Sequence, residues 1–212
     1  MSLNRYPWAS VVIEGNGRKE FGTSLFYKHL NGMEISLSGR SREVLERLVE
    51  YIRLYDTWEW KVEGKGEAKH LNDLFYLEGP DAFLENRIDQ IQSGGTEALW
   101  NEFEEQLLLV EGERIKRYLE VKEQAMIVVP NFFHDERGNP LTAGVVQADQ
   151  YISELGNYLC ENHPEIDFAL MMKITENKVS FRTTKEGMDL TYLAKKYGDG
   201  GHKEAAGCKL PQ

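Results

Sequence analysis

The sequence predicts an α/β protein in which helices join two parts. First, short apolar segments rich in β-branched residues alternate with helical patterns in residues 124–212. Second, about residues 97–123 form a long helical pattern with a narrow apolar stripe. Third, the chain opens on a strand and a helix without a preceding unit, so it looks as if it starts partway through an α/β domain. We therefore expect the C-terminal part of one α/β domain in residues 1–75, a helical connector in 76–123 and a mixed-sheet α/β domain in 124–212.

The N-terminal part has one strand pattern followed by helical patterns. Residues 8–14 are β-branched and aromatic and end at a Gly-Asn-Gly turn, which predicts a strand. A short helix is expected at residues 25–30. Ser41 is then expected to cap a longer helix whose apolar residues, three or four apart, extend to Tyr55.

The C-terminal part alternates strand and helix patterns. We expect strands at 125–129, 141–146, 166–174 and 178–182, and helices at 153–159 and 189–197. Residues 131–139 are predicted to form a polar loop. Asp189 is expected to cap the last helix, which leads into a glycine-rich segment.

Composition limits the classes of partner. The 212 residues contain 25 Lys and Arg against 35 Asp and Glu, a net charge of −10. This balance argues against binding long duplex DNA, where a basic face supplies most of the affinity, but not against a short nucleotide in a local pocket.

Cys160 and Cys208 form no metal or redox pattern. Without a signal peptide or an apolar segment of membrane-spanning length, the expected location is cytoplasmic and no membrane partner is expected.

The glycine-rich segment Tyr-Gly-Asp-Gly-Gly-His, residues 197–202, has two interpretations. Successive N–H groups of such a loop, leading into a helix, would form a nest for a phosphate, to which His202 would donate. Alternatively, the glycines only form a turn after the preceding helix. The loop alone supports both interpretations equally.

Arg182 favours the first interpretation. It ends the strand at 178–182, one helix before Gly200, Gly201 and His202, so these groups would meet at a sheet edge. An arginine there would hold phosphate oxygens in a bidentate manner. A surface ion pair is the alternative for Arg182. The neighbouring hydroxyls of Ser180 and Thr183 complete the substrate-binding candidates.

Asp56 is a second candidate position, because it lies among Tyr55, Trp58 and Trp60 at the end of a predicted helix. The position of Asp56 in the sequence favours a structural role, in which its side chain is the N-cap of the following turn. The alternative is a carboxylate for a metal ion, braced by the aromatic side chains.

The segment Ser180–Arg182, the helix after Asp189 and the sequence Tyr-Gly-Asp-Gly-Gly-His-Lys-Glu-Ala-Ala-Gly at 197–207 together resemble the C-terminal domain of DHH phosphoesterases. Asp199 departs from that family's pattern, which has glycine there. It would place a negative charge beside the phosphate site. Residues 55–60 and 71–75 are similar to the nanoRNase B branch, which degrades oligoribonucleotides a few residues long.

The resemblance implies a binding role for this chain. Family members bind two divalent metal ions, usually manganese, through an aspartate-rich motif and a DHH motif. Neither motif occurs in this sequence. Asp56 alone matches a metal-ligand position, so the chain is expected to be a fragment that is inactive alone. Arg182, His202 and the glycine loop would hold a phosphate of short RNA while the metals of the full-length parent cleave.

Two alternative functions remain at this point. The parent could act on single-stranded DNA, adenosine bisphosphate, cyclic dinucleotides or inorganic polyphosphate. The chain could instead be a non-catalytic nucleotide-binding regulatory module. An exposed sheet edge within residues 4–75 would also permit a homodimer.

Overall fold

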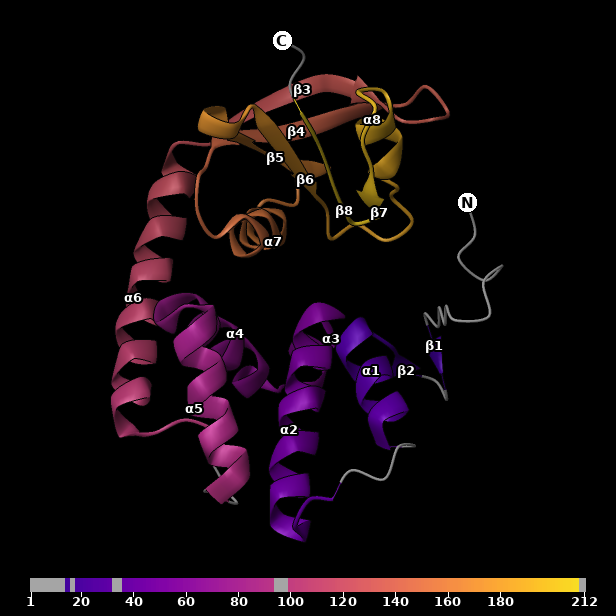
Figure 1. Cartoon of the computed structure of the whole chain (residues 1–212). Coiled ribbons are helices and arrows are strands. Elements are labelled where there is room, and N and C mark those ends of the chain that lie inside the picture. The colour runs from indigo at the N-terminus through magenta and orange to yellow at the C-terminus, as the bar shows by residue number, and fades with distance from the viewer. Residues whose placement is uncertain (1–13, 16–17, 32–35, 94–98, 210–212) are drawn as a thin grey trace. The chain divides into compact units, whose positions relative to one another are not determined.

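A computed structural model describes residues 14–15, 18–31, 36–93 and 99–209, and the chain divides into two compact units, residues 1–111 and 112–212 (Figure 1). The strand predicted at 8–14 lies outside the described residues except for Glu14. The described elements of the N-terminal unit are β1 (Glu14–Gly15), β2 (Arg18–Lys19), α1 (Gly22–Asn31), α2 (Gly39–Asp56), α3 (Glu59–Glu63), α4 (Gly66–Glu78) and α5 (Pro80–Ser93). Helix α6 (Glu102–Gln124) begins in this unit and ends in the next.

The described part of the N-terminal unit is built on helices. Helices α2, α4 and α5 pack together around a core that includes Val44, Leu71, Leu74 and Phe83. The expected cap at Ser41 is wrong, because the Ser38 hydroxyl accepts the N–H of Ser41 at 3.1 Å and α2 therefore begins earlier.

The C-terminal unit is an α/β domain, as predicted. Its strands are β3 (Ile127–His134), β4 (Pro140–Gln147), β5 (Phe168–Lys173), β6 (Lys178–Arg182), β7 (Gly201–His202) and β8 (Ala205–Lys209). Besides the end of α6, its helical elements are α7 (Ile152–Asn162), the 3₁₀ turn η2 (Ile174–Glu176) and α8 (Thr191–Lys195). The strand order is β3-β4-β5-β6-β8-β7. Only β4 and β5 pair in parallel within this described sheet, because α7 carries the chain back between them.

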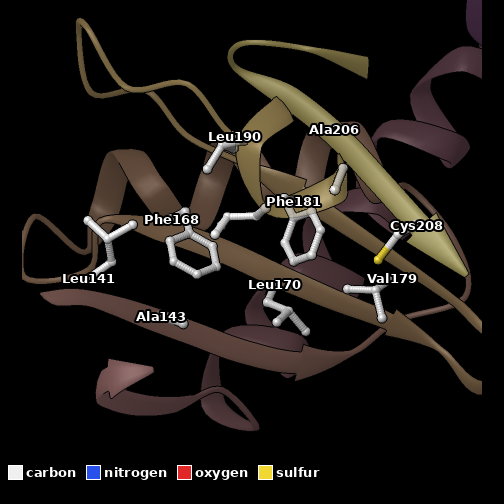
Figure 2. Close-up of a cluster of buried hydrophobic side chains, with 11 residues drawn as sticks. Leu141, Ala143, Phe168, Leu170, Val179, Phe181, Leu190, Ala206 and Cys208 are labelled. Carbon is white, nitrogen blue, oxygen red and sulfur yellow. The ribbon is translucent and has the colours of Figure 1, made fainter. Parts of the chain in front are cut away.

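Each face of this sheet carries its own apolar core. Phe168, Leu170, Val179 and Phe181 point to one face, where they pack with Leu190 of the segment that leads into α8 (Figure 2). The alternate residues of β5, including Ala169 and Met171, point to the opposite face. There they pack against α7, through Leu155 and Leu159. This alternation, which the sequence of β6 also shows, assigns every residue of β5, β6 and β8 to a face.

The loop predicted at residues 131–139 is shorter than expected. Strand β3 continues to His134 across a register shift between Val129 and Phe133, so the turn is confined to residues 135–139. There the Asp135 carboxylate accepts the N–H groups of Arg137 and Asn139, both at 2.8 Å.

The glycine-rich segment leads into a hairpin, and the expectation that it leads into a helix is wrong. Gly201 has φ 147°, and a Cβ there would lie 2.5 Å from the Ala205 carbonyl oxygen. A Cβ on Gly207 would lie 2.9 Å from the Val179 carbonyl oxygen. The glycines therefore allow β7, β8 and β6 to pair closely.

No helix in the described residues is long and apolar enough to cross a membrane.

Candidate phosphate-binding site

The strand register brings Arg182 and His202 to one face of the sheet. Arg182 on β6 is opposite Ala205 on β8, and Ala205 is opposite His202 on β7. Directly opposite residues share a face, so the three form one row across the strands. With a strand spacing of about 4.8 Å, the Cα atoms of Arg182 and His202 are about 10 Å apart. Two side chains of this length can contact one anion between them.

A cavity of about 350 Å³ opens on this same face. Its polar side chains are those of Ser153 of α7, Lys173 of β5, Glu176 of η2, and Lys178, Ser180 and Arg182 of β6, and Gly207 of β8 lies in its floor. Helix α7 covers this face over β5, and Gly207 adds no side chain over β8. The cavity is thus an opening beside α7 in which an arginine, two lysines, one carboxylate and two hydroxyl groups meet.

Helix α7 holds Arg182 through three residues on one of its sides. The Arg182 Nη2 donates to the Ser153 hydroxyl at 2.8 Å, and the Cys160 thiol donates to the Arg182 carbonyl oxygen at 3.3 Å. A Cβ at Gly156 would lie 2.6 Å from the Arg182 Cβ, so the helix backbone lies directly against the arginine stem. Spacings of three and four residues put all three on the same side of the helix. Sequence reasoning missed these residues, because only the packing of α7 on β6 connects them to Arg182.

The N–H groups of the glycine loop bond within the chain. Gly198 and Asp199 donate to the carbonyl oxygens of Lys195 and Ala194, at 3.1 and 3.3 Å. The Gly200 N–H donates to the Asp199 carboxylate at 2.9 Å. The carboxylate thus takes a place that the nest interpretation gave to phosphate. The contribution of Gly201 to substrate binding stays a prediction.

Thr183 has a different position from the other candidates. Its side chain is buried, donates to the Asp167 carbonyl oxygen at 2.8 Å and accepts the N–H of Lys185 at 3.1 Å. These bonds fix the chain where it leaves β6. The structure does not bring Thr183 into the cavity, whereas Ser180 and Arg182 line it.

Asp56 is the last residue of α2. Partial loss of hydration raises the pKa of its carboxyl group, although the residue stays exposed. The favoured N-cap interpretation is wrong, because Trp58 occupies the N-cap of α3 with φ 63° and no side chain caps that helix. Tyr55, Trp58 and Trp60 form an aromatic cluster beside Asp56 in the chain, with ring centroids 5.8 to 6.4 Å apart.

The donor set expected for a metal pair is incomplete in this chain. Among the residues that the structure describes, no three His, Cys, Asp or Glu side chains lie together as a metal-binding group. A catalytic metal ion needs about three protein ligands. Asp56 can contribute one carboxylate, so the described residues do not fit a metal pair.

The chain is similar to a known nuclease over nearly its whole length. It is 37% identical over 213 residues to the oligoribonuclease NrnB of Bacillus subtilis (strain 168), a match that covers 99% of this chain and 50% of that protein. The predicted resemblance to the nanoRNase B branch is thereby confirmed. The chain is homologous to this oligoribonuclease and spans about half the length of the curated relative it matches. No protein-family model matches the chain.

Two solved structures share a weaker similarity. An uncharacterized protein from Helicobacter pylori G27 matches 88% of this chain and 60% of its own, with 17% identity and a TM-score of 0.32. The pGpG-specific phosphodiesterase PggH from Vibrio cholerae matches 68% of this chain and 51% of its own, with 13% identity and a TM-score of 0.43. Both scores are too low to support an argument about fold or function.

Proposed function

We propose that this chain is the substrate-binding part of a phosphodiesterase that degrades short oligoribonucleotides exonucleolytically. The observation that carries the proposal is the placement of Arg182, which α7 holds in a cavity on the face that also bears His202. The similarity to NrnB supports the choice of short RNA as substrate.

The role proposed for Arg182 follows from its chemistry. A guanidinium group offers several donors in a fixed fork that matches phosphate oxygens, and it stays charged at any physiological pH. Its bond to Ser153 fixes the fork before a ligand arrives, which lowers the entropy lost on binding. His202 would donate to the same phosphate from the neighbouring side of the row.

Catalysis is proposed for the full-length parent and not for this chain alone. A divalent metal pair, in our proposal manganese, would supply charge stabilisation at the scissile phosphodiester in that protein. Asp56 would be one of its ligands. Residues of this chain would hold and orient the neighbouring phosphate.

Binding of a short oligoribonucleotide tests the proposal. Fluorescence anisotropy with a labelled dinucleotide and trinucleotide gives the dissociation constants of the natural chain and of Arg182→Ala. We expect Arg182→Ala to weaken binding about tenfold or more, the usual effect of losing hydrogen bonds to a charged group.

Lys195→Ala is the matched control, because it also removes one positive charge but lies on α8, which packs on the opposite face. Equal affinity of Arg182→Ala and the natural chain would overturn the proposed role of Arg182. Cleavage of the oligonucleotide by this chain with manganese would contradict the proposed division between binding and catalysis.

A further inference from the structure

Three lysines lie side by side across the sheet. Lys173 on β5 is opposite Lys178 on β6, and Lys178 is opposite Lys209 on β8. Directly opposite residues share a face, so the three ammonium groups project on the same side. We call Lys173, Lys178 and Lys209 the lysine row.

The lysine row lies on the face of the cavity. Lys178, Ser180 and Arg182 alternate along β6 with Val179 and Phe181, which are buried in the opposite core. Lys173 and Lys178 line the cavity with Arg182. The row and the arginine are therefore two ends of one continuous surface.

The row is electrostatically unfavourable without a counter-charge. Like charges directly opposite on neighbouring strands destabilise a sheet. Glu176 compensates part of this, since its carboxylate lies 2.6 Å from the Lys173 ammonium group. The same carboxylate also acts on Lys178, so within the part of the chain that the structure describes Glu176 is shared by two lysines of the row, in a chain whose net charge is −10. A concentration of positive charge here, against the acidic balance of the chain, points to an anionic ligand.

The spacing sets which anion the lysine row would take. Four residues along β6 separate Lys178 from Arg182, which corresponds to about 13 Å. A stacked nucleic-acid strand advances about 3.4 Å per nucleotide, and an extended strand advances more. A phosphate at the lysine row would thus lie about two to four nucleotides from the phosphate at Arg182.

We propose that the lysine row is a second phosphate subsite, which binds the backbone of the same oligonucleotide beyond the phosphate held by Arg182. This inference rests on the proposed function, because it extends that site along β6. A dinucleotide occupies the Arg182 end alone. A strand of about four or more nucleotides reaches the lysine row and gains affinity from it.

A length series of oligoribonucleotides from two to six residues tests the subsite. For the natural chain, affinity rises with length. In Lys209→Ala and in Lys209→Gln, which remove the lysine of the row that does not line the cavity, the hexanucleotide binds about two- to fivefold more weakly. Dinucleotide affinity stays unchanged in these variants, because Lys209 is opposite Lys178 on β8, about 13 Å or more from Arg182, and this exceeds the screening length of about 8 Å at physiological salt.

Salt dependence gives a second readout. Each phosphate contact contributes about 0.7 to the slope of log affinity against log salt for single strands. The Lys209 variants therefore lower this slope for the hexanucleotide and leave it unchanged for the dinucleotide. Lys195→Ala, on the opposite face, leaves both slopes unchanged.

The outcomes separate the two proposals. If Lys209→Ala weakens dinucleotide and hexanucleotide equally, or weakens neither, the second subsite is wrong while the role of Arg182 stands. If Arg182→Ala leaves every length unaffected, the proposed function fails, whatever the lysine variants do. A length-dependent loss confined to the lysine variants confirms the subsite.

Discussion

Arg182 depends for its position on residues that carry no charge. The Ser153 hydroxyl fixes the guanidinium end, Gly156 leaves room for the stem and Cys160 bonds to the backbone. Burial raises the pKa of the Cys160 thiol, so it remains a neutral donor at physiological pH. Shape and neutral hydrogen bonds therefore contribute to the position of Arg182 beside α7.

Gly156→Ala tests this arrangement. The new Cβ would lie 2.6 Å from the Arg182 Cβ, inside normal contact distance, so Arg182 or α7 must shift. We expect the free energy of unfolding to fall by about 1–2 kcal/mol and oligonucleotide affinity to fall with it. Denaturant titration and anisotropy measure the two effects.

Gly112→Ala is the matched control within a helix. A Cβ there meets nothing within 4 Å, so alanine should stabilise α6 by about 0.5–1 kcal/mol without changing affinity. If Gly156→Ala stabilises the protein as Gly112→Ala does, α7 is not in tight contact with the Arg182 side chain at Gly156.

At the level of elements, the end of α6 is tied to the end of α7 through charged groups. His163, which follows α7, lies 2.9 Å from both Glu123 of α6 and Glu165. The Tyr158 hydroxyl donates to Glu123 at 2.9 Å. Glu165 first, and Glu123 with it, raise the pKa of His163 above its ordinary value.

This pKa shift predicts a pH dependence of stability. The charged imidazole is favoured in the folded state, so its contribution is complete below the ordinary histidine pKa of about 6.5 and is lost as pH rises through the raised value. We expect His163→Gln to destabilise the protein more at pH 6 than at pH 8. Urea titrations of both proteins at the two pH values measure this. A difference between natural chain and variant that does not change with pH would contradict the role of these ion pairs.

For the molecule as a whole, the residues that we propose to bind substrate all belong to the C-terminal unit. Arg182, His202, the lysine row and both apolar cores lie within residues 112–212. Asp56 and its aromatic neighbours lie in the N-terminal unit. Binding and the one candidate metal ligand are thus assigned to different units of the chain.

A fragment of residues 112–212 should therefore fold and bind alone. We expect cooperative unfolding, because each face of the sheet keeps its own core, and a dinucleotide affinity within about twofold of the whole chain. Arg182→Ala in the fragment should abolish most of that affinity. A fragment that lacks cooperative unfolding, or folds but does not bind, would show that the N-terminal unit contributes to the site.

The sequence by itself determined the α/β character of the C-terminal part, because strand and helix periodicities depend on local alternation of apolar residues. It also determined the pairing of Arg182 with His202 as candidates. Only the tertiary structure shows that β7 and β8 form a hairpin and that the Gly200 N–H bonds to the Asp199 carboxylate. It also shows that the Thr183 hydroxyl bonds to the Asp167 carbonyl oxygen and that Ser153 of α7 bonds to Arg182. The lysine row belongs to this second group. Lys173, Lys178 and Lys209 are far apart in the chain, and only the hydrogen-bond register of three strands makes them neighbours.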